Sequence, residues 1–389
     1  MKILVYRYGS ICEPDVIRAF QKLGLTVLEE TTEITQKSLS SADRVRLVEN
    51  VLKTQQPLFV FSINFYPVIA EICHIYRTRY LCWTVDAPVP ELFSESIRHD
   101  TNRLFLFDRA QYEYFAPYNP DGIRYLPLAS DTERFDRVIA DISDRDRTRF
   151  TCDISFVGSL YNEKNPLRDL KGLSDHDRGY VDALVESALK VYGCNLVEEA
   201  MTDDLAESIR SCATDFYRME KTVTDPKRHI AAHSYVGMQI AETERIRTLN
   251  TLAQYFAVDL FTRSDVSKLQ GVRTHGGVAS LTEMPKIFHL SRINLNMTVK
   301  PIQTGLPLRI FDILGCGGFL MTNFQAELPE YFEIGVDLEA YSCMEELVEK
   351  CAYYLEHEEE RDRIARNGYQ KVCEQHTYLH RMKKMIEAL

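Results

Sequence analysis

Short apolar runs alternate with segments of helical periodicity along the first 150 residues. Lys2–Tyr6 (KILVY) and Leu58–Ile63 (LFVFSI) are apolar almost throughout, as in strands that are covered on both faces, whereas Asp15–Leu23 repeats apolar residues at the spacing of one helix face. The same two patterns predict further strands at Leu25–Leu28, Tyr80–Val85, Leu104–Phe107 and Ile123–Leu128, and helices at Ser41–Thr54 and Ile69–Tyr76. Strands that alternate with helices indicate βαβ units and a parallel sheet.

A second alternating region starts at Cys152–Val157 (CDISFV). After a polar segment of helical period at about residues 165–255, the strand pattern resumes at Val258–Phe261, near Val272, at Ile293–Met297 and at Gly318–Thr322. We therefore expect an α/β protein with two parallel-sheet domains and a helical segment inserted in the second. Two such sheets in tandem would leave a cleft at the carboxyl ends of their strands, so the functional residues are expected in the loops that follow the strands.

The composition narrows the functional classes. Lys and Arg number 46 and Asp and Glu number 57, which gives a net charge of −11 and argues against a nucleic-acid-binding protein. No apolar run approaches the roughly 18 residues of a membrane span, so no transmembrane segment is expected. The ten cysteines include no CxxC pair and are typical of free thiols in a reducing compartment, which predicts a cytoplasmic protein.

Gln303–Phe319 (QTGLPLRIFDILGCGGF) carries the clearest chemistry of the chain. Gly305 and Pro307 fit a loop that enters a helix, and Arg309 and Asp312 would share one face of that helix. The helix N-terminus and the guanidinium would bind a phosphate, and the carboxylate one turn later would accept a ribose hydroxyl. The alternative is an Arg–Asp surface pair with glycines that only end the helix.

A family resemblance adds to this interpretation. The motifs RINLNMT and PIQTGLPLRIFDILGCGGFLMTN within Arg292–Lys350, with HTYLHRM at His376–Met382 and FVGSLY at Phe156–Tyr161, resemble the donor domain of CgeB-like spore-maturation glycosyltransferases. These proteins are similar to the wider GT-B group of glycosyltransferases. The N-terminal half fits the companion domain less closely, through WTVDAP at Trp83–Pro88 and YLPLASD at Tyr125–Asp131.

The resemblance implies a GT-B fold with two Rossmann-like domains that face a central cleft. Their expected bounds are residues 1–145 on the acceptor side and 146–375 on the donor side, with the helical insertion at about 165–255 and a C-terminal helix at 376–389 that packs back toward the N-terminal domain. By position, Arg309 would contact the diphosphate of a nucleotide sugar, and Asp312 would bind its ribose. Thr304, Gly305 and Leu306 would line the phosphates, the last two through backbone amides. Many retaining relatives carry a further Glu in the loop where this chain has Thr304 and Gly305, so the choice between retention and inversion stays open.

Loops after other strands supply the remaining donor-binding candidates. Gly158 and Ser159 follow the strand at 152–157, where a small residue admits a diphosphate and a hydroxyl can donate to it; an ordinary tight turn is the alternative. Arg263 and Thr274 are expected in loops that border the nucleotide. His275, in the same loop, is a candidate acid or base, although a lone loop histidine is more often exposed and idle.

Asp86, which follows the strand at 80–85, is the second candidate catalytic residue. Its carboxylate could take the proton of an acceptor hydroxyl, and a turn or capping role before Pro88 is the alternative. His229 and His233 lie four residues apart without a nearby carboxylate motif, and no HExxH or clustered Cys/His set occurs, so no metal site is predicted.

These observations predict a metal-independent glycosyltransferase. It would move a sugar from a nucleoside-diphosphate sugar to a hydroxyl of a protein, peptide or glycan, with Arg309 and the helix stabilising the leaving diphosphate in place of a metal. No cofactor is expected beyond the donor substrate. The alternatives are a non-catalytic nucleotide- or sugar-binding module of two domains and a UDP-sugar epimerase. The helical segment is expected to shape acceptor access or a homodimer contact.

Overall fold

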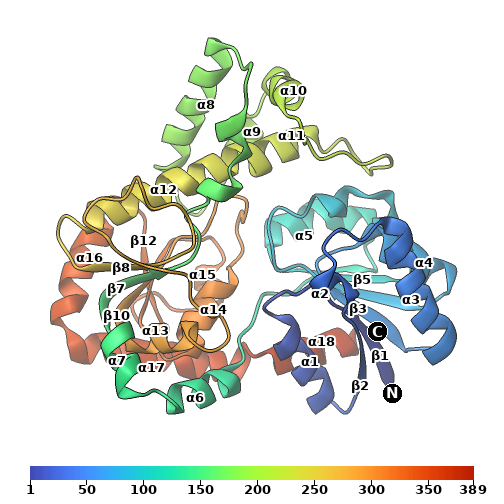
Figure 1. Cartoon of the computed structure of the whole chain (residues 1–389), viewed down its shortest axis with the longest axis horizontal. Helices are drawn as coiled ribbons and strands as arrows, with labels where there is room; N and C mark the ends of the chain where they lie inside the picture. The colour runs from blue at the N-terminus through green and yellow to red at the C-terminus, as the bar shows by residue number, and fades with distance from the viewer. The chain divides into compact units, whose positions relative to one another are not determined.

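The computed structural model describes all 389 residues and divides them into two compact units. The first unit comprises Met1–Ala129, Arg218–Pro226 and His376–Leu389, and the second comprises Ser130–Tyr217 and Lys227–Gln375. The division at 129/130 lies earlier than the boundary at 145/146 that the sequence suggested. Each unit is built around one parallel sheet with helices packed against it (Figure 1).

The sheet of the first unit has six parallel strands in the order β2-β1-β3-β4-β5-β6. The strands are β1 (Lys2–Tyr6), β2 (Thr26–Glu30), β3 (Phe59–Ile63), β4 (Arg79–Trp83), β5 (Asn102–Leu106) and β6 (Ile123–Tyr125). The helices are α1 (Glu13–Lys22), α2 (Thr32–Thr35), α3 (Ser41–Gln55), α4 (Pro67–Ile75), α5 (Arg109–Phe115) and α18 (Tyr378–Glu387).

The central strands are buried because helices cover both faces of the sheet. All five residues of β3 are buried, and Leu4 of β1 pairs in register with Val60 of β3. α1 buries Val16 and Phe20, one turn apart, as its apolar spacing predicted. The expected alternation of strands and helices is thus confirmed in the first unit.

The sheet of the second unit has the order β12-β11-β10-β7-β8-β9, again with parallel pairing throughout. Its strands are β7 (Cys152–Val157), β8 (Val258–Phe261), β9 (Arg273–His275), β10 (Ser291–Asn296), β11 (Leu320–Asn323) and β12 (Glu339–Tyr341). The helices around it are α6 (Thr132–Ala140), α7 (Asp144–Phe150), α13 (Met284–Leu290), α14 (Leu308–Gly315), α15 (Leu328–Tyr331), α16 (Met344–Glu356) and α17 (Glu358–Gln375).

A helical segment interrupts this second unit between β7 and β8, as expected. It contains α8 (Asp175–Ala188), α9 (Val197–Ala200), α10 (Asp203–Cys212), α11 (Lys227–Ile230), the π-helix η6 (Ala231–Val236) and α12 (Gly237–Leu252). Figure 1 shows the shorter helices of this segment gathered at one end of α12. They enclose a small apolar core of their own, with Leu205, Ile209 and Ile240 among its buried residues.

The sequence analysis missed strand β12. Its three residues, Glu-Ala-Tyr, carry no periodic pattern, yet all are buried. Glu339 is accommodated because its carboxylate accepts hydrogen bonds from Tyr354 Oη and Lys350 Nζ, both at 2.8 Å. Tertiary hydrogen bonds, and not local propensity, therefore make this segment a strand.

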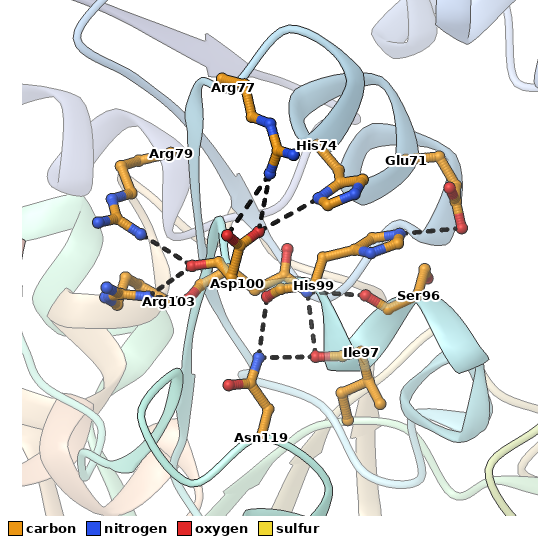
Figure 2. A network of polar contacts seen from close by, with 11 residues as sticks. Glu71, His74, Arg77, Arg79, Ser96, Ile97, His99, Asp100, Arg103 and Asn119 are labelled. Atoms are coloured by element: carbon orange, nitrogen blue, oxygen red, sulfur yellow. Dashed lines mark hydrogen bonds and ion pairs between the residues drawn. The ribbon is translucent and has the colours of Figure 1, made fainter.

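A polar network holds the amino ends of β4 and β5 in the first unit (Figure 2). The rings of His74 and His99 stack with centroids 4.1 Å apart; Asp100 lies 3.3 Å from His74 Nδ1, and Glu71 lies 3.1 Å from His99 Nε2. Asn119 Nδ2 donates to the His99 carbonyl at 3.0 Å. Because ligands of open α/β sheets bind at the carboxyl ends of strands, we assign this network a structural role.

None of the helices combines the length and the apolar character that crossing a bilayer requires. All ten cysteines are free thiols, and six of them are buried.

Candidate functional site

Strand order in the second unit creates a topological switch point between β7 and β10. From β7 the chain continues to β8 and β9 on one side, and from β10 it continues to β11 and β12 on the other. Loops that leave the carboxyl ends of β7 and β10 therefore diverge, and open α/β sheets bind their ligands at such a point. Gly158 and Ser159 follow β7 directly, which puts these two predicted residues at the switch point.

The Gly158–Ser159 turn is closed by its own hydrogen bonds. Ser159 Oγ donates to Glu163 Oε1 at 2.5 Å and accepts from the Tyr161 amide at 2.7 Å. A Cβ on Gly158 would lie at ordinary contact distance, 3.4 Å from the Phe156 ring and 4.0 Å from Arg245 Nη1, so the turn lies beside a guanidinium. The turn that the sequence analysis gave as an alternative is thus present, and it lies next to a cation.

Arg245 in α12 was not singled out by the sequence analysis. Its guanidinium spans the switch point: Nη1 donates to the Ser159 carbonyl at 2.6 Å and Nη2 donates to the Met297 carbonyl, just past β10, at 2.8 Å. No carboxylate forms an ion pair with it, and the rings of Phe156 and Tyr161 lie against it at 5.2 and 4.5 Å. Burial lowers the pKa of Arg245, because little water reaches the guanidinium to solvate its charge. Its partners lie 86 and 52 residues away, so no local spacing could have revealed it.

Arg309 lies in the first turn of α14, as predicted. Its guanidinium is near the Phe288 ring (5.0 Å) and Met284 Sδ (2.5 Å), and its ion pair with Asp312 is long, at 4.0 Å. Burial lowers the pKa of Arg309; the charge of Asp312 opposes this shift, and the charge of Arg245 adds to it. The two positive charges thus disfavour each other, and neither guanidinium has a tight carboxylate partner. A dianionic diphosphate would relieve this repulsion.

The loop before α14 is anchored by side chains from the loop after β11. Thr304 Oγ1 donates to Glu327 Oε1 at 2.7 Å, and Gln325 Nε2 donates to the Gly305 carbonyl at 3.4 Å. The side chain of Leu306 is buried and packs in the interior. The contact of its backbone amide with a phosphate stays a prediction. Glu327 is buried as well. Its carboxylate, which comes from the segment after β11, therefore lies beside the loop at Thr304 and Gly305, where the sequence itself has no acidic residue.

The structure corrects the expected setting of the residues near 275. Thr274 and His275 belong to strand β9 and not to a loop. His275 Nε2 lies 2.8 Å from Asp259 Oδ1 of β8, and its ring stacks on Phe261 with centroids 4.6 Å apart. These contacts give His275 a cross-strand structural role, while a catalytic role stays a prediction. Arg263 is exposed, and its side chain passes so close to Gly277 that a Cβ there would overlap it.

Asp86 is exposed after β4 in the first unit, at the carboxyl edge of that sheet. Its Oδ2 accepts a hydrogen bond from Asn64 Nδ2 at 2.6 Å, and the same amide group donates to Tyr8 Oη at 3.1 Å. Tyr8 follows β1 and Asn64 follows β3, which are the strands at the switch point of this first sheet. The geometry therefore holds Asp86 in a fixed orientation where an acceptor is expected to bind.

His229 and His233 are not the isolated pair that the sequence suggested. Glu198 Oε2 lies 2.9 Å from His229 Nδ1 and 2.8 Å from His233 Nε2. The three ligand atoms lie within 4.8 Å of one another. Glu198 lies 31 residues from His229 and 35 residues from His233 in the sequence, so no local motif connects the three residues.

Comparison with known proteins agrees with this architecture. Residues 245–387, which include Arg245 and Arg309, match the family described as glycosyl transferase-like. No curated protein matches the chain. The solved structure of HepE from Anabaena in complex with UDP and glucose has a TM-score of 0.54 at 13% identity, with 100% of both chains covered.

Two further solved structures are similar over the whole chain. Sucrose-phosphate synthase from Thermosynechococcus elongatus has a TM-score of 0.54 at 9% identity, with 100% of this chain and 98% of that chain covered. A glycosyltransferase from Rickettsia africae has a TM-score of 0.52 at 11% identity, with 100% and 97% covered. At these identities the likeness shows the fold: both units have the Rossmann-like architecture of the GT-B fold, and residues 245–387 match the glycosyl transferase-like family.

Proposed function

We propose that the chain transfers a sugar from a nucleoside-diphosphate sugar to a hydroxyl acceptor. The observation that carries the proposal is a pair of arginines within the region that matches the glycosyl transferase-like family: Arg245, whose guanidinium spans the switch point of the second sheet, and Arg309, in the first turn of the helix that follows β10. The bound UDP of the HepE structure is consistent with a nucleotide ligand for this fold.

The chemical role of the two guanidinium groups follows from the charge of the leaving group. Breaking the glycosidic bond leaves a nucleoside diphosphate that carries the electron pair, and preorganised cations stabilise that charge as it develops. Arg245 is held by backbone carbonyls and needs no reorganisation. Asp312, one helix turn after Arg309, would accept a ribose hydroxyl. In this proposal the transfer uses no metal ion at the diphosphate.

On the acceptor side, Asp86 would receive the proton of the attacking hydroxyl. Its hydrogen bond from Asn64 fixes the carboxylate, and the exposed position lets a large acceptor reach it. We propose a protein, peptide or glycan as the acceptor, in keeping with the resemblance to the CgeB-like family. The free cysteines support the further proposal of a reducing, cytoplasmic compartment.

Arg309 provides the decisive test. Arg309→Gln keeps the size of the side chain and removes its charge, so release of UDP from UDP-glucose in the presence of acceptor should fall about 100- to 1000-fold. The matched control is Arg247→Gln on α12, because the exposed Arg247 side chain pairs with Glu186 at the surface and makes none of the contacts described for Arg245. Full turnover by Arg309→Gln would refute the assignment.

A second assay separates the proposal from its alternatives. A binding module would gain thermal stability with UDP but release no UDP from a donor mixture, and an epimerase would convert UDP-glucose without any acceptor. For the metal-free mechanism, turnover should persist in EDTA. Strict dependence on an added divalent ion would contradict it.

A further inference from the structure

The helical segment of the second unit contains a buried cluster of two imidazoles and one carboxylate. Glu198 lies in α9, His229 in α11 and His233 in the π-helix η6. His229 and His233 are buried, with His233 only 1% exposed, and their ring centroids are 4.3 Å apart. Both rings present a nitrogen to the same oxygen atom, Glu198 Oε2, so the two helical elements converge on one point.

We propose that Glu198, His229 and His233 bind one divalent transition-metal ion, with Zn²⁺ the best-matched. Two imidazole nitrogens and a carboxylate oxygen form a donor set that Zn²⁺ takes in proteins, with water in the fourth position. The hard cations Ca²⁺ and Mg²⁺ prefer oxygen donors and are disfavoured here.

The present geometry is close to that of a metal centre. Ligand atoms of a tetrahedral zinc site lie roughly 3.3 Å apart, so the nitrogen–oxygen separations of 2.8–2.9 Å need to open by about half an ångström. The Glu198 side chain is 30% exposed, which gives an ion and its water ligand an entry on that side.

The tautomers that the two imidazoles can adopt also favour metal binding. Each imidazole offers its lone pair to a metal when its proton moves to the opposite ring nitrogen. For His233 that nitrogen is Nδ1, which has no hydrogen-bond partner, so no existing contact is lost in the change of tautomer. The neighbouring basic residues do not occupy the Glu198 carboxylate: Arg228 donates to the Glu198 backbone carbonyl, and Lys227 pairs with Glu207.

The metal would serve the helical segment as a cross-link. It would join α9 to α11 and η6 across a connection of 31 residues, with α10 lying between them in the chain. Because the site exists only in the folded chain, the binding free energy of the metal would add to the stability of this segment. The π-helix at His233 is the kind of helix irregularity that is frequent at functional sites.

The experiment titrates Zn²⁺ and Co²⁺ into full-length protein that has been stripped with EDTA and freed of chelator. Cys194 and Cys343 are exposed and are replaced by Ser in every sample, so that thiolates do not compete. Calorimetry is expected to show one Zn²⁺ per chain, and Co²⁺ should give tetrahedral d–d absorption without thiolate charge-transfer bands. Glu198→Gln and His229→Gln should weaken binding by at least about tenfold.

His176→Gln is the matched control, because His176 lies in α8 of the same segment with an exposed ring. It should bind Zn²⁺ as the parent does. Absence of saturable one-to-one binding overturns the proposal, and so does a Zn²⁺ affinity in Glu198→Gln and His229→Gln that equals the affinity of the parent. Should those variants unfold, crystals of the parent protein grown with Zn²⁺ decide the matter by anomalous scattering: a peak between the three side chains supports the site, and peaks only elsewhere refute it.

Discussion

Tyr6, Glu33 and Arg44 form a polar group at the carboxyl end of β1 in the first unit. Arg44 donates two hydrogen bonds to the Glu33 carboxylate, at 2.8 and 3.0 Å, and Tyr6 Oη donates a third at 2.5 Å. Burial acts to raise the pKa of Glu33, but the hydrogen bonds from Arg44 and Tyr6 outweigh it, so the pKa lies below its ordinary value. Glu33 is therefore a stabilising charge at neutral pH.

The pH dependence of stability follows from this shift. A carboxyl whose folded pKa is lowered contributes stability that is complete above its unfolded pKa, about 4.3 for Glu, and is lost as pH falls through the folded value. Glu33→Gln should therefore destabilise the first unit by about 1–3 kcal/mol at pH 7. The gap in melting temperature between parent and variant should narrow as the pH falls below about 4.

Glu374→Gln is the control for this pH series, since Glu374 is exposed near the end of α17. Its melting temperature should follow that of the parent at every pH. A Glu33→Gln variant whose deficit is the same at acid and neutral pH would contradict the proposed charge effect.

Sequence reasoning at the residue scale located residues whose neighbours are close in the chain, while their roles in binding stay predictions. Arg309 and Asp312 are three residues apart on one helix, and Gly158 follows its strand directly, so spacing alone placed them. Arg245 and Glu198 act through partners more than 30 residues away, and only the fold brings those partners together.

At the scale of elements, the position of α14 depends on a close approach by α17. Gly368 of α17 has no room for a side chain: a Cβ there would overlap the Asp337 carbonyl oxygen and lie 2.7 Å from Leu314 Cδ2 of α14. Because a backbone carbonyl cannot turn aside as a side chain can, the whole helix would have to shift.

Gly368→Ala should therefore lower the stability of the second unit by about 1–3 kcal/mol, measured as a fall in melting temperature. The matched control is Gly179→Ala in α8, where a Cβ would meet nothing within 4 Å. Alanine there should stabilise the helix by about 1 kcal/mol. Equal effects of the two substitutions would refute the steric argument.

Strands and helices were predictable where their buried residues form a regular pattern of apolar positions in the sequence. β7 and β8 were predicted to the residue because both are rich in apolar residues and nearly every residue in them is buried. β12 left no such pattern, and β9, with two of its three residues exposed, sits at the sheet edge, where the sequence is least constrained.

At the scale of the whole molecule, the first unit is assembled from chain segments that are far apart. α18 returns to it from the C-terminus and contacts α1. Arg381 of α18 is buried and donates from Nε to the Pro127 carbonyl at 2.8 Å and from Nη2 to the Leu128 carbonyl at 3.0 Å. Tyr378 packs edge-on against Trp83, with ring centroids 5.9 Å apart. A local pattern predicts only the helix itself, whereas the family resemblance added the expectation that it packs toward the N-terminal domain, and His376–Leu389 belongs to the first unit.

Trp83 makes the contribution of α18 measurable, because it is the only tryptophan of the chain and lies fully buried in the first unit. Truncation after Gln375 removes Tyr378, Met382 and Met385, buried side chains that each contribute about 1.5–3 kcal/mol. The urea midpoint reported by Trp83 fluorescence should therefore fall sharply. Residues 130–217 and 227–375 stay complete, so UDP binding by the second unit should persist.

Deleting only Ala388 and Leu389, which follow the helix, should leave the midpoint in place. If the long truncation left the Trp83 transition unchanged, α18 would not be part of the first unit's core, and the division of the chain into these two units would be wrong.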